Sequence, residues 1–579
     1  MVIVKLKESS QLKTSFHKWK PIEIMLAVLF LVAPFYYHPN IGGEGFRMPN
    51  NITVWMVATI IIWYSFYQVL KRPTFVIPKY FAYIASFPIL ITLSGFVTGV
   101  EQPLEWLFRL LFIWGALAFF FSLFQHGLKQ GRLDRILFVI VISALLQALV
   151  GIAQIWLRAD MPFWLPQSPT GVPAGLFQQI NNQASYQVTG IMISVYLITR
   201  PFIVRGTRWR QGLVITAVAC ASFLVMVSGS RIGLLTLVLG LIIVVPASWQ
   251  RFKVNKKLSL VLFVVLLSGA GLGSQQSNNS VIDKTVAIQS GYSGSARLGM
   301  YAIAIDLIKQ QPVFGHGIGS FGRVWQYAKP NFYKSHPDAV LPNIFISHPH
   351  NEAFFWLVEV GLIAGIGFLA LIIGVILAIR KAGWSRFGAN TAMLLPIFLH
   401  MQVELPMYSS VVHGMLFLFL LALIFGNTHK TVKLSISAIA NKTLSYSSSI
   451  FFIVALIFLT QTIRSLHDLV TSFHITNPEQ KPFIEAEKNP YFRAEVQWIK
   501  MNSILHSSIE LGISQNVAAY TVWGERMLLE RPDVVLFINL AKAYDYLGNG
   551  NAYCSVIHRG LHIYPHEGKF QQDFPNCNS

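Results

Sequence analysis

Residues 135–157 read RILFVIVISALLQALVGIAQIWL, an apolar stretch that is long enough to cross a bilayer as one helix. Comparable stretches recur along the chain and give about thirteen candidate spans. They lie near residues 22–38, 52–70, 81–99, 104–124, 135–157, 184–199, 212–228, 232–247, 258–273, 352–379, 389–404, 411–426 and 448–464. The pattern therefore predicts an all-α polytopic membrane protein with about 13 transmembrane helices.

The segments between these spans are alternately rich and poor in Lys and Arg. With the N-terminus inside, the cytoplasmic segments hold Lys5, Lys7, Lys13, Lys18, Lys20, Lys71, Arg72, Lys79, Lys129, Arg132, Arg135, Arg200, Arg205, Arg208, Arg210, Arg251, Lys253, Lys256, Lys257, Arg380, Lys381, Arg386, Lys430, Lys433 and Lys442. The opposite short segments offer little beyond Arg47, Arg158 and Arg231. Because a Lys/Arg excess in short loops marks the cytoplasmic side, residues 274–351 and the tail after 465 are predicted to lie outside.

Composition limits the possible functions. Hydrophobic residues make up 54% of the chain and charged residues 12%, with a mean hydropathy of +0.52, which excludes an ordinary soluble globular protein. Most of the net charge of +20 lies in the predicted cytoplasmic loops, so we expect no nucleic-acid partner. The basic N-terminus runs into an apolar span without an evident cleavage site, so the first span is expected to remain as an anchor.

The topology divides the chain into regions. We predict a cytoplasmic N-terminus over 1–21, a membrane domain over 22–464 with a large external loop over 274–351, and an external helical domain over 465–579. The loop is too long for a passive connector, and such loops are usually functional or disordered. A second external segment, about 158–184, is rich in Pro and Gly and then in side-chain amides.

The C-terminal region carries more charge and has amphipathic helical periods. Residues 532–565 resemble one tetratricopeptide repeat (TPR), a helix–turn–helix unit of about 34 residues. A single unit cannot bury its own apolar face, so it should pack on the preceding helices or on the membrane body. Cys554 and Cys577 both fall in this external region, where a disulfide is favoured over two free thiols. Cys220 lies in an apolar span and is expected to be a core residue.

Two external arginines are candidates for binding phosphate. Arg231 follows the sequence VSGS at the edge between two spans, and Arg297 begins an amphipathic helix in the large loop. Arginine suits phosphate because its planar fork donates paired hydrogen bonds and keeps its charge. The alternative for Arg231 is an interfacial anchor that reaches toward lipid headgroups.

The motif His348-Pro-His-Asn-Glu352 directly precedes a long span. A histidine can exchange a proton near neutral pH, and an adjacent amide or carboxylate can fix its tautomer. A metal site is disfavoured because no third ligand has convincing spacing, whereas simple capping of the helix start remains an alternative. Glu359 follows in the same span, and His400 and Glu404 end another span on the same face. The sequence PVFGHGIG at 312–319 lacks the context of a phosphate loop and predicts a tight turn.

These motifs are similar to those of the O-antigen ligase/polymerase superfamily. The resemblance covers about residues 165–425 and is carried by SGSR at 228–231, SARLGMY at 295–301, PVFGHGIG at 312–319 and HPHNEAFFWLVEVG at 348–361, the most specific of these. The stretch AGLFQQINNQAS at 174–185 further resembles the pilin-glycosylation ligases, the bacterial O-oligosaccharyltransferases. Glu404-Leu-Pro406 resembles the Glu-Tyr-Pro motif of that branch, with Leu405 in place of the aromatic residue.

The resemblance implies a GT-C-like membrane domain that transfers a glycan en bloc from an undecaprenyl-diphosphate carrier on the periplasmic face of the bacterial inner membrane. It implies no cofactor and no metal. Arg231 and Arg297 would bind the donor diphosphate, and His350 would be the catalytic histidine, with Glu359 as a second catalytic residue. The residues expected to shape the glycan or acceptor site are Gln178, Gln179, Asn181, Asn182, Tyr186, His348, Asn351 and Glu404.

The favoured function is O-linked glycosylation of a periplasmic protein such as a pilin, because residues 174–186 are rich in amides. The expected partners are thus the lipid-linked oligosaccharide, the acceptor protein and membrane lipid. Ligation of the glycan to lipid A core and polymerisation of glycan chains share the donor and remain alternatives. A transporter or flippase is a further alternative, although no repeated half is visible and the candidate groups gather at one face.

Overall fold

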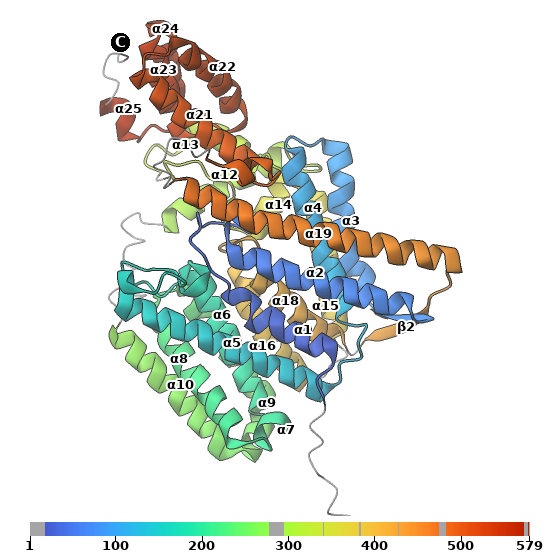
Figure 1. The fold of residues 1–579 in the computed structure, drawn as a ribbon. Coiled ribbons are helices and arrows are strands. Elements are labelled where there is room, and N and C mark those ends of the chain that lie inside the picture. The colour runs from blue at the N-terminus through green and yellow to red at the C-terminus, as the bar shows by residue number, and fades with distance from the viewer. Residues whose placement is uncertain are drawn as a thin grey trace, which may run out of the picture.

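The computed structural model describes residues 18–276, 294–339, 341–380, 384–426, 428–473, 482–572 and 577. Most of the predicted cytoplasmic N-terminus (1–17) and part of the large external loop (277–293) lie outside the described residues. The described chain forms a helical membrane body with a lobe of C-terminal helices at one end (Figure 1).

Within these ranges, nine helices are long and apolar enough to cross a membrane by length and composition. They are α2 (Pro49–Leu70), α3 (Phe81–Thr98), α4 (Pro103–Ser122), α5 (Gln130–Leu157), α8 (Arg208–Val227), α9 (Arg231–Val254), α10 (Lys256–Gln276), α15 (Leu362–Arg380) and α19 (Ala438–Ser472). The prediction of a helical multi-pass membrane protein is therefore confirmed.

The exact number of spans stays a prediction. The other four predicted spans fall on helices that are shorter or more polar, namely α1 (Pro21–Leu31), α6 (Ile180–Leu197), α16 (Trp384–His400) and α18 (Val411–Phe425). The remaining short helical segments are η1 (Ala33–Phe35), η2 (Gly45–Arg47), η3 (Arg158–Asp160), η4 (Gly175–Phe177), α7 (Pro201–Val204), α17 (Pro406–Ser409) and α20 (Ile484–Lys488).

Helix α6 lies at the centre of the membrane body. Every residue of this helix from Asn182 to Leu197 is buried, and it packs against α5, α8, α9 and α16. Small residues allow the close approach: a Cβ added at Gly190 would lie 2.7 Å from the Ala144 side chain of α5. Because small residues let membrane helices approach one another closely, α6 fixes its neighbours in place.

The predicted span 352–379 is not one helix. It is divided into α14 (Glu352–Val360) and α15 at Gly361, whose φ of +66° is in the left-handed region. The turn at 312–319 docks on this break, where two of its N–H groups donate to α14 carbonyl oxygens at 2.9 Å. Pro312 in turn accepts a hydrogen bond from the first N–H of α15 at 2.8 Å. The turn thus satisfies backbone groups that a broken helix would leave without partners.

A small sheet departs from the all-α prediction. Strand β1 (Thr74–Pro78) pairs antiparallel with β2 (His429–Lys433). The strands follow α2 and α18, so they join two loops that lie far apart in the sequence. Such pairing leaves no periodic apolar signal in either loop, which explains why the sequence did not predict it. Strand β2 lies at the right-hand edge of the body in the view of Figure 1.

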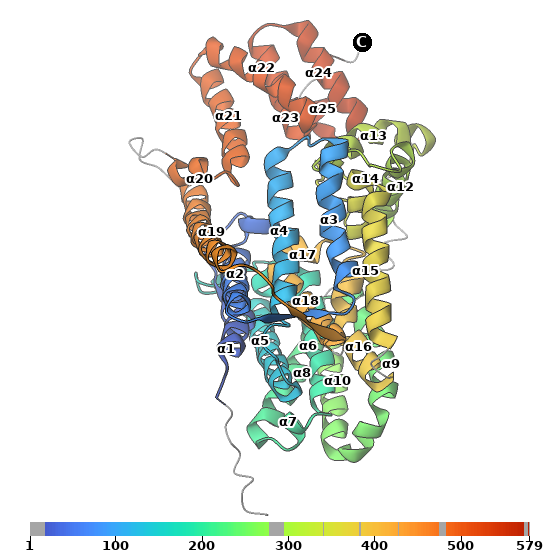
Figure 2. The same cartoon turned by 90° about the vertical axis from the view of Figure 1, so that its right-hand side faces the viewer.

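A helical layer lies between the membrane body and the C-terminal lobe. It is formed by α12 (Gly294–Gln310), α13 (Phe321–Ser335) and α14, which share a core that includes the buried side chains of Met300, Trp325 and Phe355. Helix α19 crosses the body and leads into α20 and the lobe (Figure 2). The layer therefore sits where the predicted external loop and the lobe meet.

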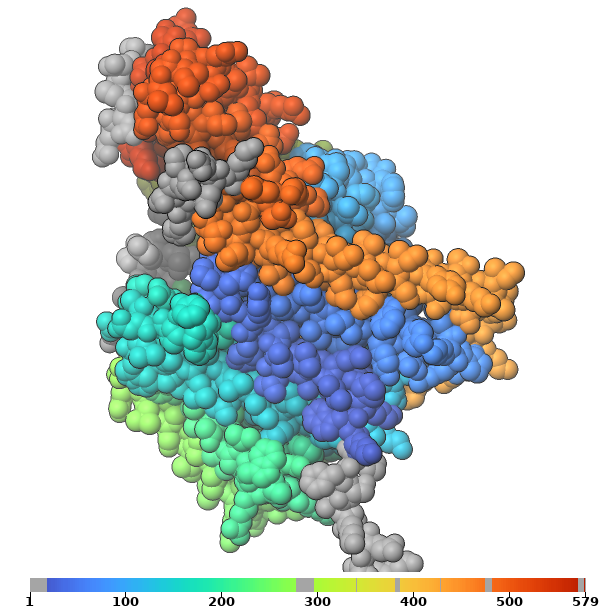
Figure 3. Space-filling view, in the orientation of Figure 1, coloured from blue at the N-terminus to red at the C-terminus, as the bar shows by residue number. Residues whose placement is uncertain are grey.

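The C-terminal lobe consists of α21 (Arg493–Glu510), α22 (Ser514–Glu530), α23 (Val534–Tyr546), α24 (Gly550–Ile563) and α25 (Gly568–Gln572). It projects from the membrane body in the space-filling view of Figure 3. Helices α23 and α24 form the helix–turn–helix expected at 532–565, and they share a buried core with α21 and α22. Cys554 and Cys577 form a disulfide in this lobe. The likeness to a TPR remains a prediction.

Candidate active site

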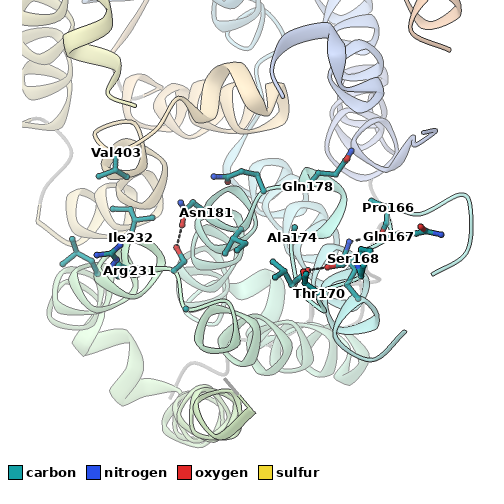
Figure 4. A pocket seen from close by; sticks show the side chains of 18 of the residues that line it. Pro166, Gln167, Ser168, Thr170, Ala174, Gln178, Asn181, Arg231, Ile232 and Val403 are labelled. Carbon is teal, nitrogen blue, oxygen red and sulfur yellow. Dashed lines mark hydrogen bonds between the residues drawn. The ribbon is translucent and has the colours of Figure 1, made fainter. Parts of the chain in front are cut away.

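A cavity of about 960 Å³ lies where the N-termini of α6 and α9 meet the segment 166–174. The candidate residues in its lining are Gln178, Gln179, Asn181, Arg231 and Arg297. Figure 4 shows Asn181, Arg231 and Val403 toward one end, and Pro166 to Thr170 toward the other. The structure therefore brings both predicted phosphate-binding arginines to one cavity, together with three of the predicted amides.

Two helix N-termini contribute to this lining. Gln179 is the N-cap of α6, and its side-chain oxygen accepts from the Asn182 N–H at 2.6 Å. Ser230 is the N-cap of α9, and its hydroxyl oxygen accepts from the Gly233 N–H at 3.2 Å, so Arg231 is the first residue of that helix. Helix N-termini carry partial positive charge. The cavity is therefore doubly suited to an anion, through helix ends and through arginines.

Glu404 links the polar groups of the cavity. Its carboxylate accepts hydrogen bonds from the amides of Gln179 and Asn181, the latter at 2.7 Å, and from the His400 ring at 3.3 Å. It also pairs with Arg297 at 3.3 Å. Burial acts to raise the pKa of Glu404, but the hydrogen bonds and the Arg297 charge outweigh it and lower that pKa. Glu404 is thus a carboxylate that holds Arg297 and two amides in position.

Two amides tie the cavity to other elements. The Asn181 side-chain oxygen accepts from the Ser230 hydroxyl at 2.7 Å, which connects Glu404 to the first turn of α9. Gln178 has a φ of +54° and donates from its side chain to Asn40 at 3.3 Å. The amide-rich stretch therefore serves as a junction between α6, α9 and the loop that follows α1.

His350 lies beside Arg297 and Glu404, although it is not among the residues that line the cavity. Its φ of +53° is rare outside glycine, and its carbonyl oxygen accepts from the Tyr301 hydroxyl at 3.3 Å. Burial, followed by the charges of His348 and Arg297, lowers the pKa of His350 to about 4. The imidazole is therefore neutral at neutral pH, so it can accept a proton.

His348 is held by a carboxylate that the sequence did not point to. Its Nε2 lies 2.7 Å from the Glu44 carboxylate, and its Nδ1 accepts from the His350 N–H at 3.2 Å. Since Nδ1 accepts, Nε2 carries the hydrogen that is donated to Glu44. Burial acts to raise the pKa of Glu44, but the hydrogen bond from His348 and nearby positive charge lower it. The rings of His348 and His350 are 4.5 Å apart between centroids. Glu44 thus fixes the imidazole that contacts His350.

Asn351 performs the capping role that was one interpretation of this motif. Its side-chain oxygen accepts from the Phe354 N–H at 3.0 Å, and its amide donates to the Gln402 carbonyl oxygen at 2.8 Å. The cap therefore belongs to Asn351, while the two histidines make other contacts. The bond to Gln402 also ties the histidine motif to the segment that carries Glu404.

Glu359 lies in a different cluster from His350. Its carboxylate is 1% exposed, pairs with Arg109 of α4 and accepts from the Phe321 N–H at 3.3 Å. Arg109 also pairs with Glu105 and lies 4.5 Å from the Phe355 ring centroid. In the described part of the chain no hydrogen bond or ion pair joins Glu359 to His350, because α14 directs the Glu359 carboxylate toward α4. The catalytic role expected for Glu359 from the sequence stays a prediction.

Tyr186 and Asn182 also lie outside the cavity lining. Asn182 is fully buried, and its amide donates to the Ser409 hydroxyl at 2.9 Å. Tyr186 is 1% exposed, and its hydroxyl forms a hydrogen bond with Ser143 of α5 at 3.0 Å. Successive turns of α6 carry both side chains into the core. They tie α6 to neighbouring elements, and their contact with substrate stays a prediction.

Among the described residues, no group of three or more His, Cys, Asp or Glu side chains is placed to hold a metal ion. The acidic and imidazole groups of the site instead pair with arginine, with amides or with each other. The chemistry that this arrangement supports is anion binding next to a neutral base.

Two protein families match the chain. The family described as O-antigen ligase matches residues 216–369, which include Arg231, Arg297 and His350. The family described as virulence factor membrane-bound polymerase, C-terminal, matches residues 389–576, which include Glu404 and most of the C-terminal lobe. A search of curated proteins found no match.

Proposed function

The chain belongs to the O-antigen ligase/polymerase superfamily, and on this premise we propose that it transfers a preassembled oligosaccharide from an undecaprenyl-diphosphate carrier to a hydroxyl of a periplasmic protein such as a pilin. The enzyme would lie in the bacterial inner membrane, with its N-terminus in the cytoplasm and with the cavity and the lobe in the periplasm. One observation carries the proposal: Arg231 and Arg297 line one cavity, and a neutral imidazole lies beside Arg297.

The arginines would bind the diphosphate of the donor. Negative charge grows on the diphosphate as its bond to the sugar breaks, so fixed cations and helix N-termini stabilise the transition state. Glu404 and the Asn181 amide hold Arg297 and the start of α9 before any ligand binds. Such preorganisation avoids the cost of arranging these groups during the reaction.

His350 would accept the proton of the acceptor hydroxyl. The acceptor oxygen then forms a bond to the anomeric carbon, the bond from that carbon to the diphosphate oxygen breaks, and the diphosphate leaves with the electron pair. A hydroxyl is a weak nucleophile, so a base in contact with it speeds the step. The Glu44–His348 pair would act as a positioning device, since His348 accepts from the His350 backbone N–H.

The resemblance of residues 174–185 to the pilin-glycosylation ligases supports a protein acceptor over lipid A core or a growing glycan. Gln178, Gln179 and Asn181 all reach the cavity, and amides can bind sugar hydroxyls as well as a peptide backbone. The three reactions share donor and geometry, so the product decides between them. Intact-mass measurement of a co-expressed pilin should show the added glycan, whereas an unmodified pilin together with newly decorated lipid A would reverse the choice.

The role of His350 is tested with a matched pair of variants. His350→Ala should lower the transfer rate by about 10²- to 10⁴-fold, the range for loss of a general base, at unchanged protein level. His336→Ala is the control, because His336 is exposed at the end of α13, where its ring contacts Ser335 and Phe332. Full activity of His350→Ala would remove this histidine from the mechanism. Activity should also survive a metal chelator, and loss of activity would contradict a metal-independent reaction.

A further inference from the structure

A second cavity, here called the basic cavity, has a volume of about 760 Å³ and lies between the ends of several membrane helices. Its lining includes Arg200, directly before α7, and α7 lies at the end of the molecule opposite the C-terminal lobe in both ribbon views (Figures 1 and 2). Its permanently charged residues are Lys20, Arg72, Arg200, Arg251 and Arg386. These cations come from five separate segments of the chain.

The lining of the basic cavity carries more positive than negative charge. In the described part of the chain, no Asp or Glu side chain lines the basic cavity. Asp134, just outside the lining, pairs with Arg200 at 3.1 Å. Arg72 and Lys20 instead donate to backbone carbonyl oxygens of the loop after α4, at 2.9 and 3.4 Å. Neutral acceptors therefore contact Arg72 and Lys20, whereas Arg200 has a carboxylate partner.

Three of the arginines in the lining lie near the buried side chain of Tyr196. Tyr196, near the end of α6, is 8% exposed, and Arg200 lies 5.6 Å from its ring centroid. Arg251 and Arg386 interact electrostatically with the same tyrosine. Gln130 of α5 donates to the Tyr196 hydroxyl at 2.9 Å. The ends of α6, α9 and α16 thus bring three cations to one cavity, near Tyr196.

Membrane topology explains why these loops carry positive charge, but it does not explain why the cations line one cavity. An excess of Lys and Arg in cytoplasmic loops sets orientation whether or not the cations meet. Like charges repel when they surround one hollow, and a bound anion reverses that cost. Guanidinium groups match phosphate oxygens with paired hydrogen bonds. The arrangement therefore calls for a phosphate-bearing ligand.

We propose that the basic cavity binds the phosphate group of an anionic phospholipid from the adjoining leaflet. The lining continues from the cations to the apolar side chains of Leu133, Leu137, Phe419 and Leu423. An acyl chain can contact these residues, whereas free phosphate can use only the cations. Basic pockets between membrane helices at the cytoplasmic surface suit such headgroups. The inference concerns a site distinct from the proposed active site and does not depend on the reaction catalysed there.

The test measures phospholipid binding by the full chain in detergent, with thermal shift and native mass spectrometry as readouts. Phosphatidylglycerol should raise the Tm of the wild type and stay bound, whereas phosphatidylcholine should do neither. Arg251→Gln/Arg386→Gln should weaken the phosphatidylglycerol Kd about 30-fold, because each cation contributes about fivefold. Arg208→Gln is the control, since Arg208 is exposed at the start of α8 and lies outside the lining.

A second double variant and a competition with inorganic phosphate complete the test. If the double Gln variant does not fold, Arg251→Lys/Arg386→Lys keeps the charge and should show a smaller loss, because lysine lacks the planar fork. Wild-type affinity in a folded double variant, or an equal loss in Arg208→Gln, would overturn the site. Inorganic phosphate that binds as tightly as the lipid and displaces it fully would overturn the lipid source.

Discussion

Two Arg–Glu pairs on the predicted external side of the molecule differ in one decisive way. Arg297 and Glu404 have side-chain exposures of 32% and 15%, and Arg297 lines the cavity next to Asn181. Arg109 and Glu359 have exposures of 11% and 1%, and aromatic rings of α14 cover the guanidinium. The same pairing chemistry thus occurs once where a ligand can reach it and once where it is sealed.

The contrast distinguishes Arg297, which we propose binds the diphosphate, from Arg109, whose guanidinium is covered. A partly exposed pair contributes little to stability, so its arginine can exchange the carboxylate for a phosphate. Removal of Glu359 from the sealed pair breaks a buried charge interaction and leaves Arg109 with only the more exposed Glu105 as its carboxylate partner among the described residues. Motif membership alone did not make this distinction, because Glu359 belongs to the most specific motif of the chain and yet turns away from His350.

The largest expected effect concerns the sealed pair. Glu359→Ala should destabilise the protein by about 3 kcal/mol, the lower end of the range for breaking a buried ion pair, because Arg109 keeps Glu105 as a partner. Measured as thermal or denaturant unfolding in detergent, this loss should exceed that of Glu404→Ala, while turnover per folded molecule changes little. If Glu359→Ala instead abolished turnover at wild-type stability, the result would support the catalytic role predicted for Glu359 from the sequence.

The open pair should show the opposite pattern. Arg297→Ala should lower transfer by about 10²- to 10³-fold, comparable to loss of one donor that stabilises a developing negative charge, with a Tm close to that of the wild type. Arg297→Lys should recover part of the activity, because it keeps the charge but not the fork. If Arg297→Ala lost stability as well as activity, the two Arg–Glu pairs would contribute to stability in the same way. That result would contradict the difference proposed here.

The Glu44–His348 contact predicts a smaller change. Glu44→Gln keeps the size of the side chain but removes the charge that orients His348, so kcat should fall about tenfold, toward the lower end for supporting groups around a catalytic site. KM for the donor should stay near the wild-type value. A general structural defect would instead change KM as well as kcat. A rise in KM with constant kcat would instead place Glu44 in substrate binding.

The pH dependence should be slight over the neutral range. The pKa of His350 is lowered to about 4, so the neutral, proton-accepting form persists as the pH falls from 8 to about 5. Below that, kcat/KM should decline through pH 4 as the imidazole becomes charged. An acid limb centred near 6.5, the ordinary histidine value, would mean that His350 is not desolvated as the structure shows.

Much of the fold followed from the sequence because hydropathy is a local signal. Each predicted span coincides with a helix or a helix pair, and the turn at 312–319 was expected from its glycines. The break at Gly361 was not foreseen, because it depends on that turn docking from a distant part of the chain. The pairing of β1 with β2 likewise depends on contact between segments that are distant in the sequence, so no local pattern predicts it.

The site was predictable in residue type more than in geometry. Arg231, Arg297 and the amides at 178–181 could be selected because phosphate and sugar recognition need such groups. Helical rotation then decided that Asn181 lines the cavity and that Asn182 does not, and the exact start of α6 sets that rotation. Glu44 and Arg109 have no local motif, so their roles required tertiary structure.

The most direct test is a cryo-EM structure of the full chain in nanodiscs with a non-transferable analogue of the lipid-linked donor. We expect diphosphate density between the Arg231 and Arg297 guanidinium groups, with the first sugar facing His350. Diphosphate density beside Arg109, or in the basic cavity at the opposite end, would contradict it.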